Sequence, residues 1–116
     1  MSYTAPVKDM LFVMKELAGL EAVSQLPGFE DAGLDTAAAV LEESARFNQD
    51  VVAPLNWEGD RNPSSFKDGT VTTTPGFKEA FRQFAQGGWQ GLQHPVAVGG
   101  QGLPKLIHAA DRKSVV

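Results

Sequence analysis

The sequence has no cysteine and only two histidines, His94 and His108. Without cysteine there can be no disulfides, thiolate metal ligands or thiol nucleophiles. The two histidines also lack the His-x-x-x-His or His-Glu-x-x-His spacing of zinc motifs, so a metal site would have to be assembled wholly by the fold. We therefore expect no metal-binding residue. Both histidines are interpreted as hydrogen-bonded structural residues, with His94 shaping the loop ahead of Pro95.

Long apolar runs and basic clusters are missing as well. No apolar run approaches the roughly 18 residues of a membrane span, and the N-terminus lacks the basic region and apolar core of a signal peptide. Lysine and arginine are scattered and the formal net charge is −4, which argues against a nucleic-acid-binding face. At 116 residues the chain is one domain at most. The sequence therefore predicts a cytoplasmic protein.

No arrangement of catalytic residues is visible either. There is no Gly-x-Ser-x-Gly nucleophile motif and no internal repeat. Glu42 and Glu43 precede Arg46 at helical spacing, which is typical of solvated surface pairs rather than of acid–base catalysis. We thus name no catalytic, cofactor-binding or metal-binding residue in this chain.

Glycine, in contrast, is concentrated in the stretch from Gly87 to Pro104, which holds half of the twelve glycines. Its spacing fits neither the dinucleotide fingerprint nor the P-loop, and it follows a helical pattern rather than a strand. Apolar residues lie between the glycines, which is not typical of a flexible linker. We expect an ordered loop between two helices, anchored by Trp89, Leu92, Val96, Val98 and Leu103.

Four segments have the apolar spacing of helices. The first follows Pro6 and stops near Gly19. The second begins at an Asp35 N-cap, and Pro54 should kink it or end it near Ala53. The third has Thr74 as its cap and Pro75 at its first position, and ends at Gly87. The last follows Pro104 and runs to Ala110, after which the pattern breaks.

The segments between these helices are predicted to be irregular, with one exception. Residues 21–34 and 57–63 are interpreted as loops or turns. Two β-prone runs, Ser65-Phe66-Lys67 and Thr70-Val71-Thr72, flank Asp68-Gly69 and predict a hairpin. A single hairpin cannot form its own core, so we expect it to pack on the helices.

An aromatic stripe marks the third helix. Phe77, Phe81 and Phe84 recur at spacings of four and three residues, on one helical face. We interpret the stripe as core packing rather than cofactor stacking. The fold class predicted overall is mostly α, with about four helices and one small β-hairpin.

Several blocks, in this order and spacing, resemble the N-terminal helical region of acyl-CoA dehydrogenases. They run from Arg46-Phe47 to Ala53-Pro54-Leu55-Asn56, and continue with Gly59-Asp60-Arg61, Asp68-Gly69-Thr70-Val71, Pro75 to Ala80, Gly87 to Leu92 and Pro95 to Pro104. The opening Tyr3 to Met10 and the turn Leu26-Pro27-Gly28-Phe29 are similar to the extra N-terminal segment of the subgroup that includes the 3-methylmercaptopropionyl-CoA dehydrogenase-like enzymes. Two features depart from the family: Ala97 and Val98 replace its usual acidic and aromatic residues, and the sequence diverges after Ala110.

The resemblance implies the N-terminal helical domain of an oxidoreductase of fatty acid metabolism. In the parent enzyme, FAD accepts a hydride while a glutamate removes the α proton of an acyl-CoA, and electrons pass to an electron-transfer flavoprotein. That glutamate and most FAD contacts lie in β and C-terminal helical domains outside this sequence, so this chain would only help to wall the acyl channel. Residues 1–34 would be the N-terminal extension and residues 111–116 a divergent tail.

A second hypothesis is a free-standing helical module that binds a partner helix or an acyl chain without chemistry. In the first hypothesis, the faces that meet the absent domains are exposed, and exposed apolar patches drive association. We therefore expect a fragment of this kind to be inactive alone, to self-associate or to be poorly stable. Whether the chain is itself an enzyme stays open at this point.

Overall fold

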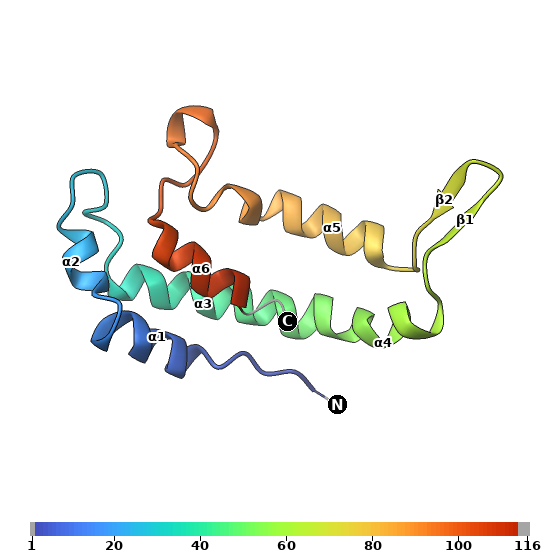
Figure 1. The fold of residues 1–116 in the computed structure, drawn as a ribbon, viewed down its shortest axis with the longest axis horizontal. Helices are drawn as coiled ribbons and strands as arrows, with labels where there is room; N and C mark the ends of the chain where they lie inside the picture. Colours follow the sequence, from blue (N-terminus) through green and yellow to red (C-terminus); the bar gives the residue numbers. More distant parts are fainter. Residues whose placement is uncertain (1, 114–116) are drawn as a thin grey trace.

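The computed structural model describes residues 2–113 of the chain and confirms a mostly helical fold with one hairpin. Its described part contains six α-helices and a two-stranded antiparallel sheet (Figure 1). The helices are α1 (Val7–Glu16), α2 (Leu20–Ser24), α3 (Leu34–Phe47), α4 (Ala53–Arg61), α5 (Phe77–Gln86) and α6 (Lys105–Lys113). The strands are β1 (Ser65–Lys67) and β2 (Thr70–Thr72), and a π-helical turn, Asn48–Val52, joins α3 to α4. Two 3₁₀ turns, Trp89–Gly91 and Val96–Val98, lie between α5 and α6.

The four predicted helices correspond to α1, α3, α5 and α6, but two predicted caps are wrong. Gly33 is the N-cap of α3, and Asp35 lies inside its first turn. Thr74 does not cap α5, because its hydroxyl donates to the Asn62 carbonyl and its side chain is buried. Gly76, with a φ of 91°, is the N-cap of α5. The N-cap position depends on the backbone dihedral angles with which the chain enters the helix, and residue type alone does not determine these angles.

The prediction of irregular structure is wrong at α2 and at α4. The chain does not stop at Pro54: it passes through the π-helical turn, in which the Ala53 N–H donates to the Asn48 carbonyl, and continues as α4. Pro54 falls in the first turn of α4, where a backbone N–H needs no partner within the helix. The Arg61 guanidinium lies 4.8 Å from the centre of the Trp57 ring, one turn away on the exposed face of α4. The polar residues that suggested a loop are therefore the solvent side of a helix.

The last helix also runs further than predicted. The helical pattern was expected to break after Ala110, but α6 continues through Asp111 to Lys113. Asp111 is buried and accepts a 2.7 Å hydrogen bond from the Ser44 hydroxyl of α3. The remainder of the predicted tail, residues 114–116, lies outside the described residues.

The apolar core occupies one end of the molecule. Both α1 and α6 pack against α3. Helix α2 lies beside the N-terminal end of α3 (Figure 1). The side chains at the centre of this cluster are Met14, Leu20, Ala32, Ala37, Leu41 and Ile107. Burial of such side chains is the main stabilising contribution in a small domain.

The other end has no core of its own. Among the described residues, no hydrophobic side chain between Arg46 and Gly91 is buried. All six strand residues of the hairpin are exposed, and the hairpin projects away from the helices (Figure 1). The expectation that it packs on the helices is therefore wrong, although the hairpin itself forms around Asp68-Gly69 as predicted, with Phe66 opposite Val71.

The molecule is a thin plate, which Figure 1 views down its shortest axis. It extends over 54 × 35 × 17 Å, and its radius of gyration is 16.6 Å. A compact domain of this length has a radius of gyration of about 13 Å. The helices therefore form little more than one layer, whereas a stable domain normally packs two.

The first prediction concerns the one-sided core. Leu41 is completely buried, so Leu41→Ala should lower the free energy of unfolding by about 2–5 kcal/mol. The matched control is Leu17→Ala, because Leu17 in the same end of the molecule is 76% exposed and its truncation leaves no cavity. Urea unfolding followed by circular dichroism at 222 nm, the usual helix signal, measures both. Equal losses for the two variants would contradict this placement of the core.

Candidate functional site

The main cavity lies between α5 and the continuous rod formed by the end of α3, the π-helical turn and α4. It has a volume of about 1050 Å³, which is at the upper end of the range for sites that bind small molecules. We call it the open groove and define it by Phe47, Val52, Leu55, Phe77, Phe81 and Phe84. Ser2 and Tyr3 line the groove as well. The irregular N-terminal segment that precedes α1 therefore reaches the groove.

The aromatic stripe of α5 faces this groove rather than a core. Phe81 is 62% exposed and Phe77 is 39% exposed. Phe84 lies deeper, with its ring centre 6.3 Å from that of Phe47 and 6.3 Å from that of Phe81. The prediction that the stripe packs in a core is therefore wrong for Phe77 and Phe81. The periodicity correctly identified one face of α5, but no second layer within residues 2–113 covers that face.

Two glycines set the spacing between α5 and the rod. A Cβ on Gly76 would lie 2.7 Å from the Leu55 Cδ2, and a Cβ on Gly59 would lie 3.0 Å from the Phe77 ring. Gly76 begins α5 and Gly59 lies on α4, so both contacts are at the hairpin end of the groove. Phe47, Phe84 and Trp89 hold the other end, with the Phe47 and Trp89 ring centres 6.5 Å apart.

The groove is almost free of charge. Among the described residues that line it, Lys78 and Tyr3 are the only ones with an ionisable side chain. Without a carboxylate or histidine, these residues have no group suited to abstract a proton near neutral pH. The groove is thus suited to bind an apolar surface or an apolar ligand.

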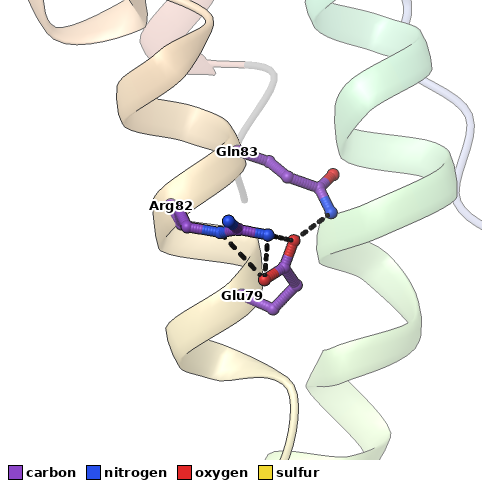
Figure 2. Close-up of polar contacts among 3 residues, drawn as sticks. All are labelled: Glu79, Arg82 and Gln83. Carbon is purple, nitrogen blue, oxygen red and sulfur yellow. Dashed lines mark hydrogen bonds and ion pairs between the residues drawn. The ribbon is translucent and has the colours of Figure 1, made fainter.

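Glu79 and Arg82 of α5 do not line the groove, and they form the ion pair shown in Figure 2. The Arg82 guanidinium donates to both carboxylate oxygens of Glu79, at 2.8 and 3.0 Å, and the Gln83 amide donates to the same carboxylate at 3.1 Å. These hydrogen bonds, that from Arg82 first, lower the pKa of Glu79, and the carboxylate raises the pKa of Arg82 in return. The predicted surface pair on α3 is also present, with Arg46 2.8 Å from Glu43.

A buried polar cluster ties α6 to the rod behind the groove. The Asn48 amide donates to the carbonyl and hydroxyl oxygens of Ser44, which in turn donates to Asp111. All three side chains are buried. A second cavity of about 410 Å³ adjoins it, lined in part by Trp89, His108 and Asp111. No local sequence pattern signals this cluster, because Ser44 and Asp111 are 67 residues apart.

The two histidines do not come together as a site. His94 is exposed and acts through its backbone carbonyl, which accepts from the Gly102 N–H in the glycine-rich loop. His108 is half-buried, and its Nδ1 has no hydrogen-bond partner among the described residues, contrary to the expectation of a hydrogen-bonded histidine. No group of three or more potential metal ligands occurs within residues 2–113.

The glycine-rich loop is ordered, as predicted, but only part of its predicted anchoring is correct. Leu92 is buried, and Trp89 and Leu103 are half-buried. Val96 and Val98 are more than 70% exposed, so the expectation that they are anchors is wrong. The loop is closed instead by backbone hydrogen bonds from Gln101 to Gly91 and from Leu103 to Leu92.

Two known proteins are similar in sequence to this chain over 90% or more of its length. No family model matches the chain. It is 41% identical over 115 residues to a 3-methylmercaptopropionyl-CoA dehydrogenase of Ruegeria pomeroyi, a match that covers 99% of this chain and 20% of that protein. It is 32% identical over 107 residues to FadE5, a broad-specificity linear acyl-CoA dehydrogenase of Mycobacterium tuberculosis, over 90% of this chain and 18% of that protein.

This chain is a relative of the acyl-CoA dehydrogenases. It spans about a fifth of the length of the relatives it matches. The resemblance found in the sequence is therefore confirmed. None of the described helices is long and apolar enough to cross a membrane.

FAD is the cofactor that the acyl-CoA dehydrogenase family implies, and the described residues do not form a site for it. A dinucleotide site places a glycine-rich turn between a strand and a helix N-terminus, whereas the glycine-rich loop here joins two helices. The groove contributes one cation, Lys78, and otherwise mainly rings and aliphatic side chains.

The second prediction tests the closure of the glycine-rich loop. A Cβ on Gly100 would lie 2.1 Å from the His94 carbonyl oxygen, so Gly100→Ala must open the turn and should cost about 1–3 kcal/mol of stability. Gly91→Ala in the same loop is the matched control, because its Cβ would make ordinary contacts, the nearest at 3.4 Å. Thermal unfolding monitored by circular dichroism distinguishes the two. A Gly100→Ala protein as stable as Gly91→Ala would contradict the close approach.

The third prediction concerns the Glu79–Arg82 pair. Because its pKa is lowered in the folded chain, Glu79 contributes stability above the ordinary carboxyl pKa, and this contribution is lost as the pH falls through the lowered value. Arg82→Gln should raise the pKa of Glu79 towards its ordinary value. Arg46→Gln, which breaks the pair on α3, should leave the pKa of Glu79 unchanged. Titration of the side-chain carboxyl carbons by NMR measures both, and an unshifted Glu79 in the unmutated protein would contradict the pairing.

Proposed function

We propose that this chain is the N-terminal helical portion of an FAD-dependent acyl-CoA dehydrogenase that introduces a double bond between the α and β carbons of an acyl-CoA. The observation that carries the proposal is the 41% identity to the Ruegeria pomeroyi dehydrogenase, which extends over 99% of this chain. Residues 1–34 are proposed as the extension of the subgroup and residues 111–116 as a divergent tail. In this proposal the chain is not catalytic alone.

The role proposed for the chain is that of a wall beside the acyl channel. The open groove supports this role, since its defining residues are all aromatic or aliphatic and leave room for an apolar chain. The base that removes the α proton, and the flavin that accepts the hydride, would be supplied by the β and C-terminal helical parts of the parent enzyme. Electrons would leave to an electron-transfer flavoprotein, and the enzyme would work in the cytoplasm.

The alternative of a free-standing binding module is less well supported. A module that works alone needs a core sufficient for its own stability. In this chain the half that carries the groove has no buried hydrophobic side chain between Arg46 and Gly91. The lack of a core in this half is better explained by a domain that packs against neighbouring domains.

The fourth prediction is a segment exchange. The matched fifth of the Ruegeria pomeroyi dehydrogenase is replaced by this chain, and FAD content and acyl-CoA-dependent dye reduction are measured with 3-methylmercaptopropionyl-CoA. The chimera should bind FAD and turn over, while this chain alone should do neither. Leu55→Lys in the chimera should lower kcat/KM more than about tenfold, because a charge would be buried against the apolar channel. Val98→Lys, at an exposed site outside the groove, is the control.

Two outcomes would contradict the proposal. Acyl-CoA-dependent dye reduction by the isolated chain would show that it is catalytic by itself. A chimera that binds FAD but is as active with Leu55→Lys as without it would show that the groove does not border the acyl channel.

A further inference from the structure

The chain exposes far more surface than a self-contained protein of its mass. Its accessible area is 8130 Å². A folded monomer of 12.4 kDa exposes about 6,100 Å². The excess of about 2,000 Å² is more than twice the roughly 800 Å² that each partner buries in a standard protein–protein interface.

Exposed apolar side chains are prominent in the half of the molecule that carries the open groove. Phe81, Trp57 and Val71 are each more than 60% exposed there, and Phe77 is 39% exposed. Isolated exposed apolar residues are ordinary, but a contiguous apolar patch marks an interaction site. With a thickness of 17 Å, the plate also lacks the second layer that normally covers a helical face.

Charge distinguishes the groove from the exposed apolar residues on and directly after α1. There Phe12, Val13 and Leu17 lie among charged residues, including the exposed Lys15–Glu16 pair. The groove has one cation, Lys78, at its edge. Two copies that meet at the groove would therefore bury few charges, even though each carries a net charge of −4.

We propose that this chain forms a twofold homodimer in solution, in which the open groove of each copy is covered by α5 of the other. A twofold interface uses the same patch on both copies, and α5 with the groove is such a patch, since it offers both projecting rings and the hollow that receives them. Phe77 and Phe81 of one copy then fill the groove of the second. The paired plates form the two helical layers that one copy lacks. This proposal concerns the 116-residue chain itself and does not depend on the proposed enzymatic function.

Sedimentation velocity of the chain over a wide concentration range is the first test. The unmutated chain should sediment as a dimer that dissociates on dilution. Phe81→Lys should raise the dissociation constant more than tenfold, because each copy would bury a new charge in the partner's groove. Val98→Lys is the matched control: Val98 is 76% exposed and lies outside the groove, so this variant should remain a dimer. Helical circular dichroism of each variant checks that it is folded.

The second test uses the absence of native cysteine. Ala80→Cys places a single thiol in the groove lining on α5, and mild oxidation should give a disulfide-linked dimer. Val98→Cys should stay unlinked under the same conditions. This measurement keeps the proposal testable even if Phe81→Lys fails to fold.

The opposite results would overturn the proposal. A monomer at all concentrations would do so, and if that monomer binds a fatty-acyl probe, the occupant of the groove is an apolar ligand instead. A dimer that tolerates Phe81→Lys, or one in which Val98→Cys crosslinks and Ala80→Cys does not, would place the interface elsewhere.

Discussion

The structure depends on the packing of α1 and α6 against α3. Met14, Leu41 and Ile107 meet there, and all three are essentially inaccessible to solvent. The elements between the π-helical turn and the glycine-rich loop extend from this one anchored end, because α4, the hairpin and α5 bury no hydrophobic side chain. Such a half has little apolar burial to offset the conformational entropy that its ordering costs. Its order must be supported by the rod that continues from α3 and by whatever covers the groove.

Pro54 illustrates how the rod is continued. A proline inside a helix removes a hydrogen bond and crowds the preceding turn, and the sequence therefore predicts a kink or an end. The structure places the π-helical turn, Asn48–Val52, immediately before it, and starts a new helix there. π-Helical turns inside helices frequently occur at functional sites. Here the turn contributes Asn48 to the buried polar cluster and Val52 to the groove, so one irregularity supplies a residue to each.

Sequence reasoning succeeded where the signal is local and failed where it is not. The periodicity of α1, α3, α5 and α6 and the Asp68-Gly69 turn depend on neighbouring residues, and these elements were predicted. What lies against a helical face is decided by distant parts of the chain, so the exposure of Phe77 and Phe81 was missed. The same limit explains Ser44 and Asp111, which meet only because α6 returns to α3. The burial of Asp111 also shows that part of the apparent tail is integrated in this fold.

The described residues leave the groove open. If α5 could move onto the rod, the apolar surface would be buried at little cost, and no external occupant would be needed. The hairpin end opposes this, since Leu55 and the Phe77 ring already fill the space that a Cβ on Gly76 or on Gly59 would occupy. At the other end the Phe47, Phe84 and Trp89 rings are already in contact. The two helices are thus held apart at a fixed spacing by residues at both ends of the groove. No described residue covers its apolar surface, which is therefore open to a second copy, the remainder of a dehydrogenase or an acyl chain.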